Sequence, residues 1–234
     1  MIPSDFWTMI FELDPKHALF PHPSLAEEDG LLAIGGDLST ERLLNAYRQG
    51  IFPWYSKETP ILWYAPHERF VLYPYKIKVS KSMRKSFARN DFTFTSDQAF
   101  EQVIAECSRV PRKDQDGTWI VPDMIRAYSE LHQAGFAHSI EVWQKNVLVG
   151  GLYGVLIGKV FCGESMFSRI SNASKAALIH LCQDYDLELI DCQIHSEHLE
   201  SMGAESMIQA DFFHLLADQQ MEADGLQKLL RWTK

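Results

Sequence analysis

The segment from Gly150 to Gln193 constrains the fold of this chain more than any other part. It holds two glycine-punctuated apolar stretches, GGLYG at 150–154 and GESMFS at 163–168, and it ends in Asp191-Cys192-Gln193. The residue patterns predict paired strands, then a helix, then a further strand. Polar groups at the ends of apolar strands are costly to bury unless they are hydrogen-bonded, so they usually mark a site. The sequence therefore predicts a site where these strands end.

The second part of the chain has the alternating pattern of a mixed α and β protein. Turns at Lys145-Asn146 and Ile157-Gly158 separate the strands of an expected antiparallel meander. Helical spacing and strand alternation give the other expected elements. Strands are expected at 70–73, 76–79, 138–143, 147–156, 159–166 and 187–193, and helices at 82–89, 97–107, 122–133, 173–185 and 210–218.

The first 66 residues differ from the rest. Ser39 is suited to cap a helix over 40–49, and Gly50 is placed to end it. The prolines and aromatics that follow, beginning with Phe52-Pro53-Trp54-Tyr55, suit a rigid and partly exposed wall. We expect an α+β fold, with a small N-terminal α/β domain at 1–66 and a second domain at 67–234. The central sheet of the second domain is expected to be mixed and mostly antiparallel.

The order of meander, helix and strand resembles the acyltransferase fold of the GNAT superfamily. That fold splits a central sheet to admit an acyl donor. Its acetyl-CoA-dependent members carry a phosphate-cradling Q/R-x-x-G-x-G/A loop, which is absent between Phe167 and Lys175. We therefore expect a GNAT-like acyltransferase domain whose donor is not CoA.

Composition narrows the class of protein. Hydrophobic residues make up 46% of the 234 residues, which is ample for a core and argues against disorder. No apolar run approaches the roughly 20 residues of a membrane span, and the N-terminus lacks the pattern of a secretory signal. The four cysteines form no C-x-x-C pair, so free thiols in a reducing cytoplasm are expected. No metal-ligand spacing occurs, and neither a metal nor another cofactor is expected.

Charge is unevenly distributed along the chain. The net charge is −9, yet the range 76–90 holds six basic residues and no acidic one. From Gln183 to the C-terminus, eleven acidic residues face three basic ones. The basic segment could meet a polyanion and the acidic part a cationic partner, although a solvated helix face explains the basic segment equally well.

Strand alternation brings candidate groups together. Residues two apart on a strand point the same way, so Asp191 and Gln193 are expected to share a face, as are Cys162, Glu164 and Met166. Two carboxylates and an amide would then meet at an apolar cleft. This set suits acyl transfer to an amine, because a carboxylate can take up or steer the proton and an amide can orient the nucleophile. Taken singly, Asp191 could instead cap a loop and Gln193 could be a surface amide.

Seven segments in a fixed order carry a more specific resemblance. They are FPW at 52–54, GTWI at 117–120, HSIEVW at 138–143, GGLYG at 150–154, GESMFS at 163–168, SK at 174–175 and DCQ at 191–193. From about Phe20 to Leu216 the chain resembles the bacterial leucyl/phenylalanyl-tRNA–protein transferases. The resemblance implies an aminoacyltransferase that moves Leu, Phe or Met from its tRNA to proteins with N-terminal Arg or Lys. It also implies that the product is marked for degradation by the N-end rule pathway.

The same resemblance assigns residues to the aminoacyl end of the donor. The apolar pocket would be formed by Trp54, Trp119, Leu152, Met166 and Tyr128. Within the catalytic group, Glu164 would contact polar atoms of the aminoacyl end. Asp191 and Gln193 would be the pair that assists attack by the acceptor α-amine on the ester carbonyl. A ribose hydroxyl of the tRNA is the alternative to Asp191 as proton acceptor.

Partners follow from the resemblance as well. Lys81, Arg84 and Lys85 would hold the phosphates of the tRNA acceptor stem, independent of its sequence. The acidic C-terminal half would attract the cationic N-terminal residue of the protein acceptor. We expect no membrane partner, a cytoplasmic location and a monomer.

Two other classes remain as alternatives. A CoA-dependent GNAT acetyltransferase is disfavoured by the missing phosphate loop. A non-catalytic protein that binds the tRNA end is disfavoured because Glu164, Asp191 and Gln193 are all present.

Overall fold

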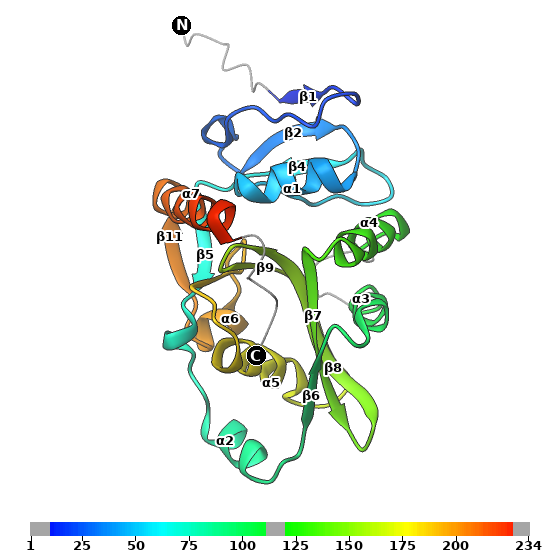
Figure 1. The fold of residues 1–234 in the computed structure, drawn as a ribbon, viewed down its shortest axis with the longest axis vertical. Helices are drawn as coiled ribbons and strands as arrows, with labels where there is room; N and C mark the ends of the chain where they lie inside the picture. Colours follow the sequence, from blue (N-terminus) through cyan, green and yellow to red (C-terminus); the bar gives the residue numbers. More distant parts are fainter. Residues whose placement is uncertain (1–9, 111–119, 227–234) are drawn as a thin grey trace, which may run out of the picture.

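Two β-sheets organise the chain. The computed structural model describes residues 10–110 and 120–226, with the side chains of the last helix described as far as Gln219. The smaller sheet has four strands in the order β1-β2-β4-β3 and the larger has seven in the order β11-β5-β10-β9-β8-β7-β6. In Figure 1 the smaller sheet lies at one end of the molecule, above the larger one.

The N-terminal part pairs the smaller sheet with one helix. Its elements are β1 (Phe11–Leu13), η1 (Pro23–Leu25), β2 (Leu31–Gly35), α1 (Thr40–Arg48), β3 (Phe52–Pro53) and β4 (Leu62–Tyr64). Ser39 caps α1 as expected, because its side chain accepts a hydrogen bond from the backbone N of Arg42. Gly50 has φ +70°, and a Cβ there would come within 2.9 Å of Phe212 and Phe213 of the last helix. Glycine is therefore needed both for the turn and for close packing.

The larger sheet is mixed and mostly antiparallel. Its strands are β5 (Glu68–Leu72), β6 (Thr93–Ser96), β7 (Ala137–Gln144), β8 (Val147–Ile157), β9 (Val160–Ser168), β10 (Leu189–Asp191) and β11 (Glu205–Ile208). β10 pairs with β9 in parallel, and every other pairing in this sheet is antiparallel. The expected α+β class, with a small N-terminal α/β part and a mixed second sheet, is confirmed.

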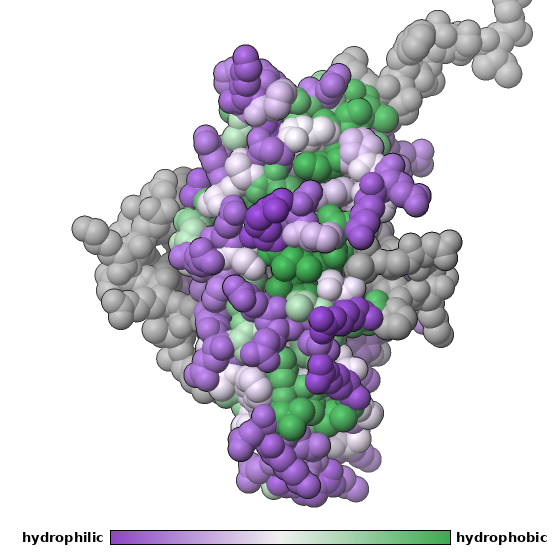
Figure 2. Space-filling view, turned by 90° about the vertical axis from the view of Figure 1, so that its right-hand side faces the viewer, coloured by the Kyte–Doolittle hydropathy of each residue, from purple (hydrophilic) through white to green (hydrophobic). Residues whose placement is uncertain are grey.

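Helices cover both faces of the larger sheet. They are η2 (Pro74–Lys76), α2 (Lys81–Ala88), α3 (Phe100–Cys107), α4 (Pro122–Gln133), α5 (Ala173–Asp184), α6 (Glu197–Ser201) and α7 (Gln209–Leu226). α3 and α4 contribute to one hydrophobic cluster and α5 to another, on opposite sides of the sheet. On the face that carries α3 and α4, hydrophilic residues are interspersed with hydrophobic ones (Figure 2). Within the described ranges, no helix combines the length and the apolar character that crossing a membrane requires.

Several predicted elements differ from the observed ones. The strand expected at 76–79 is wrong: the 3-10 helix η2, which starts at Pro74, ends at Lys76, and residues 77–79 form neither helix nor strand. α3 begins at Phe100 rather than at 97, since Asp97 has φ +57° and accepts a hydrogen bond from the backbone N of Ser139. The strand expected at 187–193 is only three residues long, as β10, and the helix expected at 210–218 continues to Leu226. β6 was not expected from the sequence.

One hydrophobic cluster runs through both parts of the chain. It combines residues of the N-terminal part, such as Leu43 and Trp63, with residues of the second part, such as Val103 and Tyr153, and all four are fully buried. The cluster therefore fixes the N-terminal part against the larger sheet. The boundary at 66/67 stays a prediction.

Candidate active site

A largely apolar cavity of about 550 Å³ opens where β9 and β10 face α5. Leu178 and Leu181 of α5 line one side and Phe161 and Ile190 of the sheet another. Pockets of this size, with few polar groups, are typical of small-molecule sites. The polar side chains that line it include Glu164 and Gln193, which are hydrogen-bonded to each other.

The predicted pocket residues fall into three groups. Trp54, Leu152 and Met166 line the cavity. Tyr128 does not line it, but its hydroxyl contacts the carboxyl group of Glu164. Trp119 lies outside the described residues.

A β-bulge at Glu164 interrupts the alternation of β9. Tyr153 pairs with Ser165, and the next residue of β8, Gly154, pairs with Gly163, so Glu164 is the extra residue of β9. The alternation changes phase here: Cys162 belongs to one hydrophobic cluster, whereas Met166 packs against the other. The predicted common face for Cys162, Glu164 and Met166 is therefore wrong. Bulges often re-aim a side chain beside a site.

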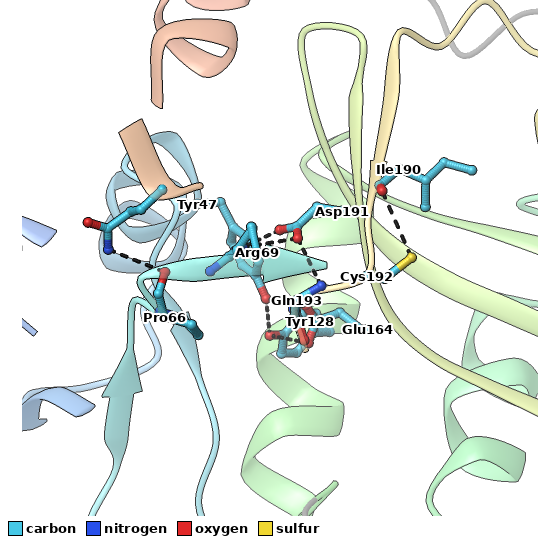
Figure 3. A network of polar contacts seen from close by, with 10 residues as sticks. Tyr47, Pro66, Arg69, Tyr128, Glu164, Ile190, Asp191, Cys192 and Gln193 are labelled. Carbon is cyan, nitrogen blue, oxygen red and sulfur yellow. Dashed lines mark hydrogen bonds and ion pairs between the residues drawn. The ribbon is translucent and has the colours of Figure 1, made fainter. Parts of the chain in front are cut away.

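Glu164 is the centre of a buried hydrogen-bond network (Figure 3). Its Oε1 lies 2.7 Å from the hydroxyl of Tyr47 and accepts a 2.7 Å hydrogen bond from Nε2 of Gln193. Its Oε2 lies 3.1 Å from the hydroxyl of Tyr128. The hydroxyls of Tyr47 and Tyr128 are also hydrogen-bonded to each other. Four side chains from α1, α4, β9 and the end of β10 thus meet at one carboxyl group.

Asp191 lies behind this network in a buried ion pair. Its Oδ1 accepts hydrogen bonds from Nε of Arg69 at 3.1 Å and from the backbone N of Gln193 at 2.8 Å. Its Oδ2 accepts from Nη2 of Arg69 at 2.6 Å. Asp191 is 0% exposed and Glu164 is 7% exposed. Both Asp191 oxygens are therefore engaged; Asp191 and Glu164 both line the cavity, and Glu164 is the more exposed of the two.

The carboxylate of Asp191 supports the backbone at the end of β10. Gln193 has φ +66°, a conformation that a non-glycine residue rarely adopts and that the surrounding structure must hold. The hydrogen bond from its backbone N to Asp191 supplies part of that support. The strand ends at Asp191 and the chain turns, so strand alternation does not extend to Gln193, yet both residues line the cavity. The turn brings the Gln193 amide to Glu164.

Burial dominates the electrostatics of the site. It raises the pKa of Glu164 to about 7; the hydrogen bonds with Tyr47, Tyr128 and Gln193 oppose this rise, and the negative charge of Asp191 adds to it. Burial, followed by the nearby charge of Glu164, holds the pKa values of Tyr47 and Tyr128 well above their ordinary value. Both tyrosines therefore keep their protons at neutral pH.

Tyr47 and Arg69 belong to the network but were not predicted from the sequence. Tyr47 continues the buried face of α1, and nothing in that pattern distinguishes it from an ordinary core tyrosine. Arg69 did leave a signal, because a charged residue beside the apolar run Phe70-Val71-Leu72 needs a buried partner. The guanidinium of Arg69 lies 4.9 Å from the ring centre of Phe52 and 4.7 Å from that of Phe212.

The predicted tRNA-binding residues lie on α2, away from the network. Lys81, Arg84 and Lys85 are exposed, and none of them forms an ion pair with a described residue. Lys76 and Arg89 of the same basic segment are paired, with Glu205 and Asp91. Figure 1 places α2 at the end of the molecule opposite the N-terminal sheet.

The fold and the site together define a class of protein: an α+β protein whose largely apolar pocket is lined by a buried carboxyl and amide pair. Two family models match the chain. Residues 71–217 match the leucyl/phenylalanyl-tRNA protein transferase model, and residues 36–67 match the model of the N-terminal domain of these transferases. The chain belongs to the leucyl/phenylalanyl-tRNA–protein transferase family and is an aminoacyltransferase.

Members of this family from other organisms are similar to this protein over most of its length. A leucyl/phenylalanyl-tRNA–protein transferase of Syntrophobacter fumaroxidans is 55% identical over 206 residues, which cover 87% of this chain and 88% of the relative. One from Hydrogenovibrio crunogenus is 49% identical over 228 residues, covering 95% and 88%. Among solved structures, a GCN5-related N-acetyltransferase from Kribbella flavida aligns with a TM-score of 0.35 and 9% identity, covering 69% of this chain and 58% of its own.

Proposed function

We propose that this aminoacyltransferase moves Leu, Phe or Met from its tRNA to the α-amine of proteins that begin with Arg or Lys. The product would carry a new N-terminal residue that marks it for the N-end rule pathway. One observation carries the proposal: the largely apolar cavity of about 550 Å³ is lined by the hydrogen-bonded Glu164 and Gln193 pair. An apolar side chain with a polar reactive end is the ligand that such a cavity suits.

The residues that line the cavity suit the breadth of the proposed donor set. Leu152 and Met166 line the space for the side chain, and Trp54 lines it from the N-terminal part. A flexible thioether adapts to both a branched aliphatic and an aromatic side chain. An apolar wall separates such side chains only weakly, which fits a pocket that accepts Leu, Phe and Met.

The reaction needs orientation more than a strong base. A terminal α-amine has a pKa of about 7.7–8.0, so part of it is neutral near pH 7. The amine nitrogen attacks the ester carbonyl, the C–N bond forms, and the C–O bond to the ribose breaks. The proton lost by the amine passes to the ribose oxygen. Glu164 would carry this proton, while Gln193 orients the reacting groups.

Asp191 takes a positioning role in this proposal. Its two oxygens are engaged by Arg69 and by the backbone N of Gln193, so it holds Gln193 in place. The carboxyl and amide pair that faces the substrate is then Glu164 and Gln193. A ribose hydroxyl of the tRNA remains the alternative carrier of the proton.

The remaining parts of the proposal concern partners. Exposed cations of α2 would bind phosphates of the acceptor stem. The acidic C-terminal half would attract the cationic first residue of the acceptor protein. The protein would act as a monomer in the cytoplasm, where aminoacyl-tRNA is formed.

One assay tests the reaction. The protein is incubated with labelled Leu-tRNA and a peptide that begins with Arg, and with the same peptide acetylated at its N-terminus. Label is expected on the free peptide alone. Acetyl-CoA turnover without transfer from tRNA would overturn the proposal, and so would tight tRNA binding without transfer.

A further inference from the structure

Tyr47, Tyr128 and Glu164 form a closed triangle of hydrogen bonds. Each of the two hydroxyls contacts one oxygen of the carboxyl group, and the two hydroxyls contact each other. The amide of Gln193 donates a fourth hydrogen bond into the carboxyl group. All four side chains are buried.

The four hydrogen bonds of this network need four protons, one for each. Tyr47 and Tyr128 each supply one hydroxyl proton, and Gln193 supplies one N–H to Oε1. Three protons cannot fill four hydrogen bonds. With Glu164 ionised, both hydroxyls would donate to the carboxylate, and their two oxygens would be in close contact with no proton between them. A fourth proton on the carboxyl group fills every contact.

We propose that Glu164 is protonated in the resting enzyme and that Tyr47 and Tyr128 close a ring of hydrogen bonds around it as positioning residues. In the ring, the carboxyl group donates to Tyr128, Tyr128 donates to Tyr47, and Tyr47 donates back to Oε1. Tyr47 belongs to α1, so the N-terminal part of the chain sets the proton state of a group on β9.

The surroundings of the ring support a neutral carboxyl group. The titratable and charged groups around it in the described part of the chain come from six elements. They are Tyr47 of α1, Arg69 of β5, Tyr128 of α4, Tyr153 of β8, Cys162 of β9 and Asp191 of β10. The one cation, Arg69, forms its ion pair with Asp191 rather than with Glu164. Burial raises the pKa of Glu164 to about 7, in agreement with the proton count.

A second buried carboxyl group, that of Glu141, has as many donors as hydrogen bonds. Glu141 of β7 is 0% exposed and accepts hydrogen bonds from the hydroxyls of Ser139 and Thr95, each at 2.5 Å, and from the backbone N of Gln98 at 3.4 Å. Nε1 of Trp143 donates to Thr95 Oγ1, which leaves the Thr95 proton for Glu141. Three donors fill three contacts, so Glu141 is satisfied as a carboxylate.

The two glutamates therefore respond differently to the same substitution. In Glu164→Gln, the new amide N–H replaces the carboxyl proton and the ring stays closed. In Glu141→Gln, the new amide N–H faces a hydroxyl that must turn and lose its own acceptor. We expect the urea midpoint of Glu164→Gln to equal that of the wild type at pH 4.5, to exceed it at pH 6, and to exceed it by more at pH 8. The midpoint of Glu141→Gln should fall at pH 6 and at pH 8.

The pH dependence has a definite sign. The pKa of Glu164 is raised from 4.5 to about 7 on folding, so the folded state holds the proton more tightly than the unfolded state. The resulting stability is complete below about pH 4.5 and is lost as the pH rises to about 7. The wild type loses this contribution by pH 8, and Glu164→Gln has none to lose. A Glu164→Gln midpoint that falls at pH 6 as far as that of Glu141→Gln would overturn the proposal.

Infrared spectroscopy reports on the proton directly. At pH 6 the wild type should show the C=O stretch of a protonated carboxyl group, which Glu164→Gln removes and Glu141→Gln retains. Tyr47→Phe should move this band to higher frequency, because the carbonyl oxygen loses a hydrogen bond, whereas Tyr185→Phe should leave it in place. Absence of the band in the wild type would refute the protonated state.

The consequence for catalysis rests on the proposed function. A neutral carboxyl group can give its proton to the departing ribose oxygen and regain one from the attacking amine. Because the midpoints and the infrared band are measured without substrate, they are independent of the transfer assay. A protein that lacks transfer activity could still show the ring, and an active one could lack it.

Discussion

Asp191 and Arg69 form a buried pair in which each charge compensates the other. Each is buried, and their carboxylate and guanidinium groups are joined by two hydrogen bonds. Removing one partner of such a pair leaves a buried charge without compensation, at a cost of about 3–5 kcal/mol. Asp191→Ala should therefore lower the free energy of unfolding by about that amount as well as reducing transfer.

A double variant separates these two effects. Arg69→Met with Asp191→Leu removes both charges, and buried pairs replaced by apolar residues of similar size are often tolerated. We expect its denaturation midpoint to return toward that of the wild type, while transfer stays low because the backbone N of Gln193 has lost its acceptor. Full recovery of transfer would show that Asp191 does not position Gln193.

Individual residues differ in how far the sequence reveals them. Glu164 and Gln193 could be predicted, since a polar residue at the end of an apolar strand is conspicuous. The local backbone could not, because a bulge at Glu164 and a positive φ at Gln193 break the alternation on which the prediction relied. Tyr47 could not be identified, since its hydroxyl meets Glu164 only through contacts 117 positions apart in the chain.

The bulge of β9 depends on one glycine of its partner strand. A Cβ at Gly154 would lie 2.3 Å from the carbonyl oxygen of Cys162 and 2.7 Å from the ring of Phe161. At Gly163, its register partner, the nearest atom would be 3.5 Å away, an ordinary contact. We expect Gly154→Ala to lower the free energy of unfolding by about 1–3 kcal/mol.

The register partner supplies the control for this element. Gly163→Ala makes the same chemical change and should stay within about 0.5 kcal/mol of the wild type. Thermal or urea denaturation of both variants measures the difference. Equal losses would mean that the bulge does not depend on the close approach of β8 and β9 at Gly154.

Helix α2 allows a test of the tRNA interaction as a separate element. Lys81→Ala with Arg84→Ala removes two exposed cations that have no ion pair among the described residues. If each neutralises one phosphate, the slope of log K against log salt should flatten by about 2. Lys16→Ala, which removes an exposed cation of the N-terminal part, should leave the slope unchanged. An unchanged slope in the α2 variant would place the phosphate contacts elsewhere.

Elements were predicted best where periodicity was long and unbroken. The meander of β7, β8 and β9 and the helix α5 follow from alternation, helical spacing and turn residues with positive φ at Lys145 and Asn146. Elements shaped by a proline or by tertiary contacts were missed. η2 at Pro74 replaced an expected strand, and the start of α3 is set by the hydrogen bonds of Asp97 to Ser139 and His138.

The whole molecule is joined by its site as well as by its core. Tyr47 reaches Glu164 from α1, and Phe52 stacks on the Arg69 that holds Asp191. The hydrophobic cluster that includes Trp63 continues into the larger sheet. The N-terminal part is therefore needed to complete the network, and its packing cannot be separated from the geometry of the site. Composition and patterning alone gave no sign of this coupling.

This coupling predicts a single unfolding transition for the full chain. Trp63 is fully buried in the N-terminal part, and Trp143 lies on β7 of the second part. The fluorescence lost in Trp63→Phe reports on the N-terminal part, and the fluorescence lost in Trp143→Phe reports on the second part. Circular dichroism reports on both parts. Because one cluster of buried side chains spans the boundary, all three signals should change at one urea concentration. A separate, earlier midpoint for the Trp63 signal would mean that the N-terminal part unfolds on its own, and Tyr47 would then leave Glu164 before the larger sheet opens.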